Sequence, residues 1–370
     1  MIRLAFRNLF QNKIRLVISS GGVALALLLI LSLDAIFTGV EKRITAYIEN
    51  SGADIWVSQE DVFNMHMASS SLPDSVARKV KAVPGVDSVS PIHYLANNII
   101  AGDERNLAYV IGLTEDAELG GPWSVSAGRS LPDEDEVIMD RGVAEKSGIG
   151  LGDEVEILGK DFTVVGFTEG TSSLVNSIAF ISMKDFEDLR KNYDTFSFLL
   201  VKVNDGQSPE VVADRIRAQV RDVTVQTRDQ FAGQERKVVK DMSTDLVTIM
   251  NLIGFLIGLA VLSLTVYTST LSRRREYGML KALGARNRDL YLTVLAQAML
   301  SVVLGFLFGL TITVLLSLII PVLGVNLTMV VSRVSLLKVA SASLILAGIS
   351  GMIPIRQIAG LDPVMVFRGR

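Results

Sequence analysis

The sequence contains no cysteine and only two histidines among its 370 residues. The absence of cysteine excludes disulfide bridges, thiolate zinc sites, iron–sulfur clusters and cysteine nucleophiles. The sequence also lacks an excess of positive charge, because 36 Lys and Arg oppose 39 Asp and Glu, for a formal net charge of −3. A balanced charge gives no electrostatic reason to expect nucleic acid as a partner. Only 20% of the residues are charged and 49% are hydrophobic, which indicates a surface in contact with lipid.

The common catalytic motifs are missing as well. The chain contains no phosphate-binding G-x-x-x-x-G-K-[ST] loop, no G-x-S-x-G nucleophile turn and no H-E-x-x-H zinc motif. The acidic run Asp133-Glu134-Asp135-Glu136 is typical of a solvated loop, because four consecutive carboxylates point in several directions. The sequence therefore predicts no catalytic residues, no metal-binding residues and no ATPase site of its own.

Long uncharged runs hold many of the apolar residues. A helix that crosses the hydrocarbon core of a membrane needs about 20 residues at a rise of 1.5 Å each. The run from Leu290 to Ser332 exceeds that length, and Pro321, Gly324 and Asn326 interrupt its far end. It predicts one long helix followed by an irregular external connection at 321–335. Four transmembrane helices are therefore predicted, at residues 16–40, 246–272, 290–320 and 336–355.

Positively charged flanks predict the orientation of these helices, because Lys and Arg favour the cytoplasmic side. Such residues gather before the first predicted helix, between the second and third, and after the fourth. An amphipathic helix at 1–15, the segment 273–289 and the tail 356–370 are therefore expected in the cytoplasm. We thus expect a multi-pass protein of the cell (inner) membrane, with both termini in the cytoplasm and residues 41–245 on the other side.

The segment 41–245 has ordinary globular composition and is long enough to build its own hydrophobic core. Short strand patterns and helical patterns follow one another irregularly along it, which favours an α+β fold over a regular βαβ alternation. A β-rich distal lobe is expected at about 113–173, inserted in a membrane-proximal α/β lobe. The predicted fold class is an α+β membrane protein, with four transmembrane helices and a large α/β extracytoplasmic domain between the first and second.

Two G-x-x-x-G motifs occur within the predicted membrane helices, at Gly254 and Gly258 and at Gly305 and Gly309. Small residues at this spacing let helix backbones approach closely. The motifs therefore serve either the packing of one chain or contact with a second copy, and the residues alone favour neither.

The most specific local pattern lies between the second and third predicted membrane helices. It reads SRRREYGMLKALGA from Ser272 to Ala285. The pattern predicts a short helix over 275–283, which Gly284 ends in the left-handed conformation. Two interpretations stay open from the residues alone, a charged loop that sets topology or a docking helix for a cytoplasmic partner.

This segment resembles the R-x-R-E-[IY]-G-[MIV]-L-[KR]-A-[LI]-G-A signature of permeases of the type VII ABC superfamily. Members of this superfamily include MacB, FtsX, the lipoprotein-releasing permeases, and the heme-exporting and DevC-like permeases. Other parts of the chain are similar to the same family: Leu4-Ala5-x-x-Asn8-Leu9, Gly52-Ala53-Asp54-Ile55-Trp56-Val57, Gly128-Arg129-x-Leu131, Gly152-Asp153 and Asp362-Pro363. The likeness extends along essentially the whole chain.

The resemblance implies a homodimeric permease that works with a separate dimer of cytoplasmic ABC ATPases. ATP and magnesium would bind to that partner, and no cofactor is expected on this chain. Membrane lipids are further expected partners, and the resemblance leaves open a periplasmic adaptor protein. The signature assigns ATPase coupling to six residues of the cytoplasmic segment: Arg275, Glu276, Gly278, Leu280, Lys281 and Gly284.

Candidate cargo-binding residues lie in and after the first predicted helix. Met65, His66 and Met67 carry soft or borderline ligand atoms that suit heme iron or copper, and residues 49–71 most resemble the heme-exporting and DevC-like branch. An exposed loop with apolar anchors is the alternative for these three residues. Asp34 is an ionisable residue within the first predicted helix, where it either faces an internal site or reaches the lipid headgroups.

Together these patterns predict an exporter of hydrophobic or amphiphilic cargo, with heme, glycolipid and lipoprotein as candidate classes. The alternative is a mechanotransmission protein that activates an extracytoplasmic cell-wall hydrolase. The large two-lobed external segment argues against that alternative. A membrane enzyme has no catalytic residues to support it.

Overall fold

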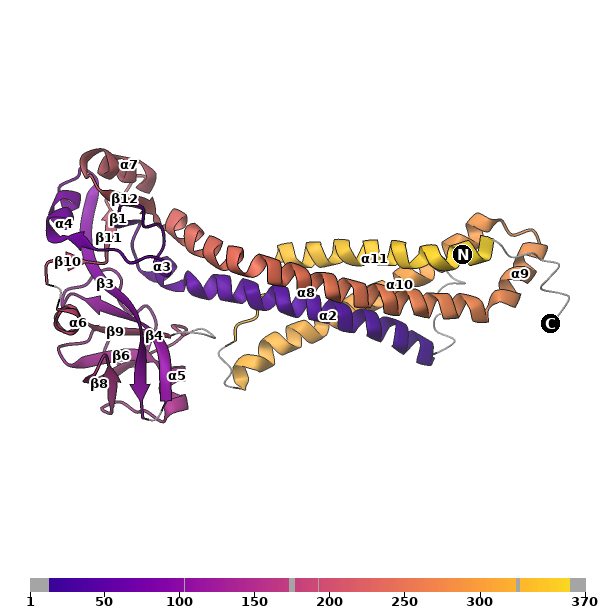
Figure 1. The fold of residues 1–370 in the computed structure, drawn as a ribbon, viewed down its shortest axis with the longest axis horizontal. Coiled ribbons are helices and arrows are strands. Elements are labelled where there is room, and N and C mark those ends of the chain that lie inside the picture. The colour runs from indigo at the N-terminus through magenta and orange to yellow at the C-terminus, as the bar shows by residue number, and fades with distance from the viewer. Residues whose placement is uncertain (1–12, 103, 173–176, 192, 324–326, 360–370) are drawn as a thin grey trace. The chain divides into compact units, whose positions relative to one another are not determined.

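The computed structural model describes residues 13–102, 104–172, 177–191, 193–323 and 327–359 (Figure 1). The chain forms two compact units. The helical unit comprises Met1–Gly39, Ser243–Leu323 and Met329–Arg370, and the α/β unit comprises Val40–Met242 and Gly324–Thr328. The expected N-terminal amphipathic helix up to residue 12 and the predicted tail from residue 360 lie outside the described residues.

Within the part of the chain that the structure describes, four long apolar helices build the helical unit, as the hydrophobic runs predict. They are α2 (Lys13–Ile44), α8 (Arg228–Ser272), α10 (Asn287–Val322) and α11 (Arg333–Ala359). By length and composition, each contains a segment able to cross a membrane: Leu16–Ile44, Arg228–Ser272, Asn287–Val322 and Arg333–Met352. The prediction of four membrane helices is thereby confirmed.

All four helices extend beyond the predicted membrane segments. Helix α8 begins at Arg228, whereas hydrophobicity alone starts the second membrane helix at residue 246. The polar residues in between include many Gln, Glu, Arg and Lys, which favour helix and therefore continue it outside the apolar run. Helix α10 includes Pro321 and ends at Val322, so the proline lies inside the last turn instead of after the helix.

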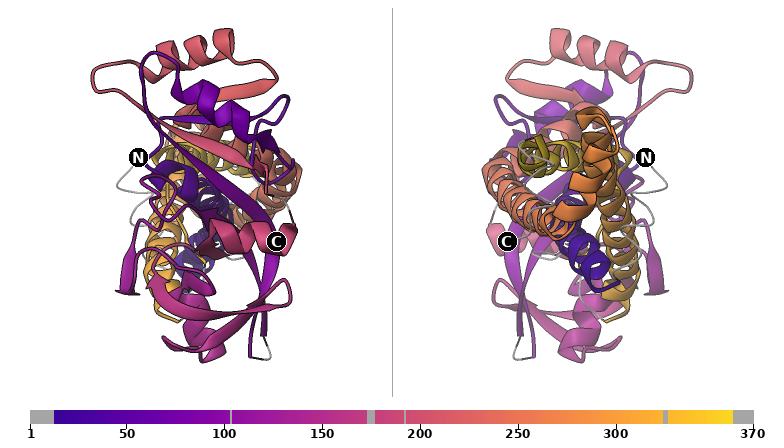
Figure 2. Two further views of the ribbon diagram at one scale, coloured as in Figure 1. Left: turned by 90° about the vertical axis from the view of Figure 1, so that its left-hand side faces the viewer. Right: turned by 90° about the vertical axis from the view of Figure 1, so that its right-hand side faces the viewer.

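The four helices pack side by side around one apolar core (Figures 1 and 2). Its buried members come from every helix: Val23, Leu27 and Leu31 of α2, Leu262 and Val266 of α8, Val294, Ala298 and Val302 of α10, and Val339, Leu346 and Ala347 of α11. The core accounts for the arrangement of the helices within this unit.

Both G-x-x-x-G motifs face α2 of the same chain. A methyl group added at Gly305 on α10 would lie 2.7 Å from Cγ1 of Val23. One added at Gly254 on α8 would lie 2.9 Å from Cγ1 of Ile30, and the second glycine of each motif also approaches α2. Larger residues would clash at these distances, so the two motifs serve the packing of helices within one chain.

The α/β unit contains one mixed ten-stranded sheet in the order β12-β1-β11-β3-β4-β9-β6-β8-β5, with β7 beside β3 and β8. Its strands are β1 (Ile55–Gln59), β3 (Val86–Ala101), β4 (Glu104–Leu113), β5 (Val125–Gly128), β6 (Glu136–Asp140), β7 (Glu154–Ile157), β8 (Lys160–Thr168), β9 (Ser177–Ser182), β11 (Phe198–Val203) and β12 (Val223–Thr227). A separate pair joins β2 (Leu72–Pro73) and β10 (Thr195–Phe196). The helices that accompany these strands are α3 (Ala46–Asn50), α4 (Asp74–Lys81), α5 (Arg141–Ser147), α6 (Met183–Arg190) and α7 (Pro209–Gln219).

Strand β3 connects two lobes of the α/β unit. It pairs with β11 up to Ile92 and with β4 from His93 onward. The apolar core of the second lobe includes Ile99 of β3 and Phe186 of α6, both outside the predicted distal lobe. The β-rich lobe therefore extends well beyond residues 113–173, because both lobes share one long strand that the sequence pattern does not reveal.

Candidate functional site

The segment after α8 folds as a short helix, as predicted. Helix α9 spans Arg274–Ala282, one residue earlier than expected at each end. Gly284 follows it, exposed and with φ +94°. The backbone N–H groups of Gly284 and Ala285 donate to the carbonyl oxygens of Lys281 (3.1 Å) and Leu280 (3.0 Å). This pair of hydrogen bonds is the Schellman motif, so the prediction that Gly284 ends the helix in the left-handed conformation is confirmed.

The predicted coupling residues differ in their exposure. Arg275 and Glu276 are exposed, Leu280 and Lys281 are half-buried, and Gly278 is buried. The set therefore contains exposed side chains that are accessible to a partner, and others that are at least half-buried against the protein itself.

Two apolar side chains of the same segment are also exposed. The exposed fraction is 50% for Met279 and 83% for Leu283. Large apolar side chains beside charged ones are typical of a protein contact surface. We call Arg275, Glu276, Met279 and Leu283 together the α9 surface.

Tyr277 attaches α9 to the helical unit. Its side chain is only 2% exposed and lies in the same apolar core as Leu290 and Val294 of α10. Its hydroxyl has no hydrogen-bond partner among the described residues. The sequence pattern does not single out this residue, although the helical period places positions 277 and 280 on one face.

The candidate cargo residues Met65, His66 and Met67 lie in the loop between β1 and β2 and line one cavity, but they differ in exposure. Met65 is 3% exposed and belongs to an apolar core, whereas Met67 is 64% exposed. Between them, Nδ1 of His66 lies 2.6 Å from Oε2 of Glu235. Within the described part of the chain, no group of three or more His, Cys, Asp or Glu side chains is arranged to hold a metal ion.

Glu235 is a further residue that the sequence pattern does not single out. It lies on α8 and is fully buried, and its carboxylate accepts hydrogen bonds from the backbone N–H of Met65 and from the ring of His66. Such partners are necessary, because an unpaired carboxylate in the protein interior costs several kcal/mol. The pair fixes the loop to α8. No local pattern could reveal it, because His66 and Glu235 are 169 residues apart.

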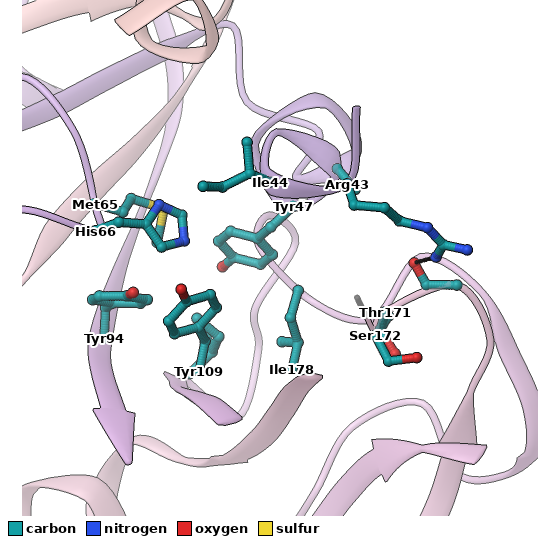
Figure 3. Close-up of a pocket in the computed structure, with 13 residues that line it drawn as sticks. Arg43, Ile44, Tyr47, Met65, His66, Tyr94, Tyr109, Thr171, Ser172 and Ile178 are labelled. Atoms are coloured by element: carbon teal, nitrogen blue, oxygen red, sulfur yellow. Dashed lines mark hydrogen bonds between the residues drawn. The ribbon is translucent and has the colours of Figure 1, made fainter. Parts of the chain in front are cut away.

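A small cavity lies beside this pair (Figure 3). The rings of Tyr47, Tyr94 and Tyr109 line it together with His66, and the ring centroids of His66 and Tyr109 are 4.5 Å apart. Burial raises the pKa of Tyr47 and of Tyr94 above the usual range, so both hydroxyls stay protonated. The cavity volume is about 30 Å³, which admits roughly two water molecules and no cargo.

Asp34 lies half-buried in α2, within the candidate membrane span Leu16–Ile44. Its backbone carbonyl accepts a hydrogen bond from Oγ1 of Thr38 at 2.8 Å. The next carbonyl, of Ala35, accepts one from the backbone N–H of Val330 at 2.9 Å. The carboxylate of Asp34 forms no hydrogen bond or ion pair with other described residues. Its role in cargo binding stays a prediction.

Two protein-family models match this chain. The family model of the MacB-like periplasmic core domain matches residues 16–219, and that of the FtsX-like permease C-terminal domain matches residues 248–363. The chain belongs to the MacB and FtsX family of ABC transporter permeases. The resemblance carried by the α9 segment is thereby confirmed, whereas the likeness to the heme-exporting and DevC-like branch stays a prediction.

Known relatives of this permease extend over the full chain. An uncharacterized ABC transporter permease of Methanocaldococcus jannaschii is 26% identical over 395 residues, which cover 100% of this chain and 98% of the relative. The macrolide export ATP-binding/permease protein MacB of Hahella chejuensis is 23% identical over 98% of this chain and 59% of the relative. Among solved structures, the periplasmic region of MacB from Actinobacillus actinomycetemcomitans is 16% identical, with a TM-score of 0.39 over 50% of this chain and 94% of that structure.

Family membership implies a membrane protein that works with a cytoplasmic ATPase. The four apolar helices agree with the first of these statements. The Hahella relative is named both an ATP-binding and a permease protein, and this chain spans about three fifths of it. This chain therefore corresponds to part of the length of that relative, whereas it covers nearly all of the Methanocaldococcus permease.

Proposed function

We propose that this permease, as one of two copies in a homodimer of the inner membrane, uses ATP hydrolysis by a separate ATPase dimer to expel a hydrophobic or amphiphilic cargo. The observation that carries the proposal is the α9 surface. It presents two charged residues and the apolar Leu283 to solvent, while Tyr277 holds the helix against the bundle core. A rigidly attached surface of mixed character suits a protein partner that must push or tilt the helix.

Helix α8 supports transmission of that motion. It is one unbroken helix from Arg228 to Ser272, and α9 begins two residues after its end. Near its start, the fully buried Phe231 stacks on Trp56, with ring centroids 4.7 Å apart and an interplanar angle of 14°. A displacement of α9 would therefore pass along a continuous helix to residues buried in the α/β unit.

Polar contacts reinforce this connection at the start of α8. The buried carboxylate of Glu235 binds the loop that carries His66, and Arg236 forms an ion pair with Glu49 of α3 at 2.9 Å. The Arg236–Glu49 pair is largely exposed and contributes about 0–1 kcal/mol to stability. The buried contact between Glu235 and His66 therefore contributes more to holding the loop against α8.

Export is proposed from the names of relatives. One is the macrolide exporter described above, and another is a probable syringafactin export ATP-binding/permease protein of Pseudomonas syringae, 22% identical over 98% of this chain and 57% of the relative. Both names describe export, and we extend export to this chain; the hydrophobic or amphiphilic character of its cargo is part of the proposal. Heme as the cargo and a periplasmic adaptor protein as a partner stay predictions.

The proposed role of the α9 surface can be tested with a substitution that strains the backbone at the end of α9. Gly284→Val places a β-branched residue at φ +94°, a conformation that such residues rarely adopt, and should disorder the end of α9. Gly159→Val is the matched control, because Gly159 also has positive φ (+82°) and open space around it but lies in the α/β unit. Both variants and Glu276→Lys are purified in lipid nanodiscs with the cognate ATPase, and the ATPase rate is measured.

We expect Gly284→Val and Glu276→Lys to lose most of the stimulation of the ATPase by the permease, and Gly159→Val to retain it. Unchanged stimulation and transport in both α9 variants would remove the docking assignment. An equal loss of ATPase stimulation in Gly159→Val would show that backbone strain anywhere in the chain causes the effect. That result would also count against the docking assignment.

A further inference from the structure

A larger cavity opens elsewhere in the α/β unit, among the loop that follows Met65, strand β3, helix α6 and the segment that joins β10 to β11. Its volume is about 490 Å³, within the range of roughly 300–1,000 Å³ that small-molecule sites occupy. Both histidines of the chain line it, His66 from the loop and His93 from β3.

The walls of this cavity are amphiphilic. Aromatic side chains of β3, α6 and β11 form one part of the lining, namely Tyr94, Phe186 and Phe198. The loop contributes the hydroxyl-bearing residues Ser69 and Ser70. A molecule with an apolar body and polar substituents would therefore find complementary groups on both sides.

His93 is an unusual polar group in such a wall. It is 3% exposed, and its ring stacks on Phe186 with centroids 4.6 Å apart and an interplanar angle of 1°. Nε2 is buried without a hydrogen-bond partner among the described residues, and the carboxylate of Glu187, at 4.0 Å, is too distant to supply one. A buried nitrogen without a partner is costly, so the site favours a molecule that supplies one.

The protonation state of His93 fits this role. Burial, together with the nearby charge of Arg190, lowers the pKa of His93 to about 4. The ring is therefore neutral at pH 7, and Nε2 is able either to donate or to accept a hydrogen bond.

Arg190 gives the cavity its charge. It ends α6, is exposed, lines the same cavity and forms no salt bridge with the described residues. No acidic side chain belongs to the described lining. A guanidinium group binds carboxylate or phosphate oxygens in a bidentate manner, so the charge of the site favours an anion.

We propose that this cavity binds a small amphiphilic anion. Its apolar, preferably planar, body lies against Phe186 and Phe198, its oxyanion group pairs with Arg190, and a polar substituent reaches His93. The inference rests on the proposed function, because it identifies the α/β unit as the place where the exporter captures amphiphilic cargo and adds negative charge to the description of that cargo.

Histidine-selective isotope labelling provides a direct test. The chain has only two histidines and both line the cavity, so the ¹³Cε1 spectrum of this permease in nanodiscs contains two protein signals. The probes are 2-naphthoate, 2-naphthyl phosphate and the cationic analogue 2-naphthylmethylammonium. We expect at least one of the two anions to shift both signals saturably and the cation to leave them unchanged. The anion with the lower dissociation constant identifies carboxylate or phosphate as the preferred group.

Three variants sharpen the test. Arg190→Gln should weaken binding of the preferred anion about tenfold, as expected for the loss of a charge-assisted hydrogen bond. Lys184→Gln is the matched control, because it removes a positive charge from the same helix outside this cavity. Ala96→Trp places a large ring at an exposed position of the lining and should abolish the shifts without removing any polar group.

Several results would overturn the proposal: no saturable shift with either anion, equal binding of the cation, or equal weakening by Arg190→Gln and Lys184→Gln. ATPase stimulation is measured on the same samples. Intact stimulation in a permease that fails to bind the anions removes this inference and leaves the proposed function standing, whereas loss of stimulation only in the α9 variants leaves the binding result unaffected.

Discussion

Tyr277→Ala should detach α9 from the bundle while the four long helices stay folded. The ring is 2% exposed and packs in the core that Leu290 and Val294 share. Removal of a buried aromatic ring costs about 3–5 kcal/mol in soluble proteins, since it loses both transfer free energy and packing. Lipid tails are as apolar as a protein core, so this value is an upper limit for a bundle in a membrane.

Tyr277→Phe is the matched control. It keeps the ring and removes a buried hydroxyl that has no partner among the described residues. Leaving such a group unpaired costs about 1–3 kcal/mol, so its removal should be neutral or slightly stabilising. The contrast between the two variants separates ring packing from hydroxyl bonding.

Thermal unfolding and ATPase stimulation, measured on the purified permease in nanodiscs, report the two effects. We expect Tyr277→Ala to have a lower unfolding temperature and to lose most of its stimulation of the ATPase. Tyr277→Phe should keep the unfolding temperature and the ATPase stimulation of the wild type. Full stimulation in Tyr277→Ala would refute the argument that this ring holds α9 in its working position. Equal loss in Tyr277→Phe would show that the hydroxyl has a partner in the assembled transporter.

Three further predictions concern His93, the loop residues Met65, His66 and Met67, and Asp34. The pKa of His93 is about 4 in the folded state and 6.5 in the unfolded state, so the free energy of unfolding should fall by on the order of 3 kcal/mol between about pH 6.5 and 4. Urea titrations measure this pH dependence, and an equal pH dependence in His93→Gln would contradict the prediction. If Met65, His66 and Met67 bind heme, replacing all three with Ala should weaken binding and shift the Soret band, and a wild-type protein without a saturable heme spectrum rules this out. If Asp34 faces a wet cavity, Asp34→Leu should impair transport at normal expression, whereas full activity favours the headgroup position.

The features that the sequence predicts well depend on local physics. The membrane helices follow from uncharged runs, because the hydrocarbon core admits few charged residues, and their number agrees with the structure. The end of α9 follows from one residue, since Gly284 adopts positive φ more readily than other residues. The surrounding signature also leads to the correct permease family.

The features that the sequence does not predict depend on contacts between distant segments. Glu235 reads as one polar residue of a long helix, and only the fold places its carboxylate against His66. His93 and Arg190 look unrelated, yet α6 packs beside β3 and brings both to one cavity. The extent of the second lobe was missed for a similar reason, since β3 pairs with β11 in one lobe and with β4 in the other.

Site-specific photocrosslinking from Leu283 tests the central claim, that the α9 surface binds the ATPase, most directly. Leu283 is 83% exposed on that surface, and Leu158, 41% exposed in the α/β unit, is the matched control. A photoreactive residue is placed at each position in turn, the permease is expressed with its ATPase, and the membranes are irradiated. We expect an adduct with the ATPase from position 283 and none from position 158. Absence of an ATPase adduct from position 283, or an equal adduct from position 158, would contradict the claim.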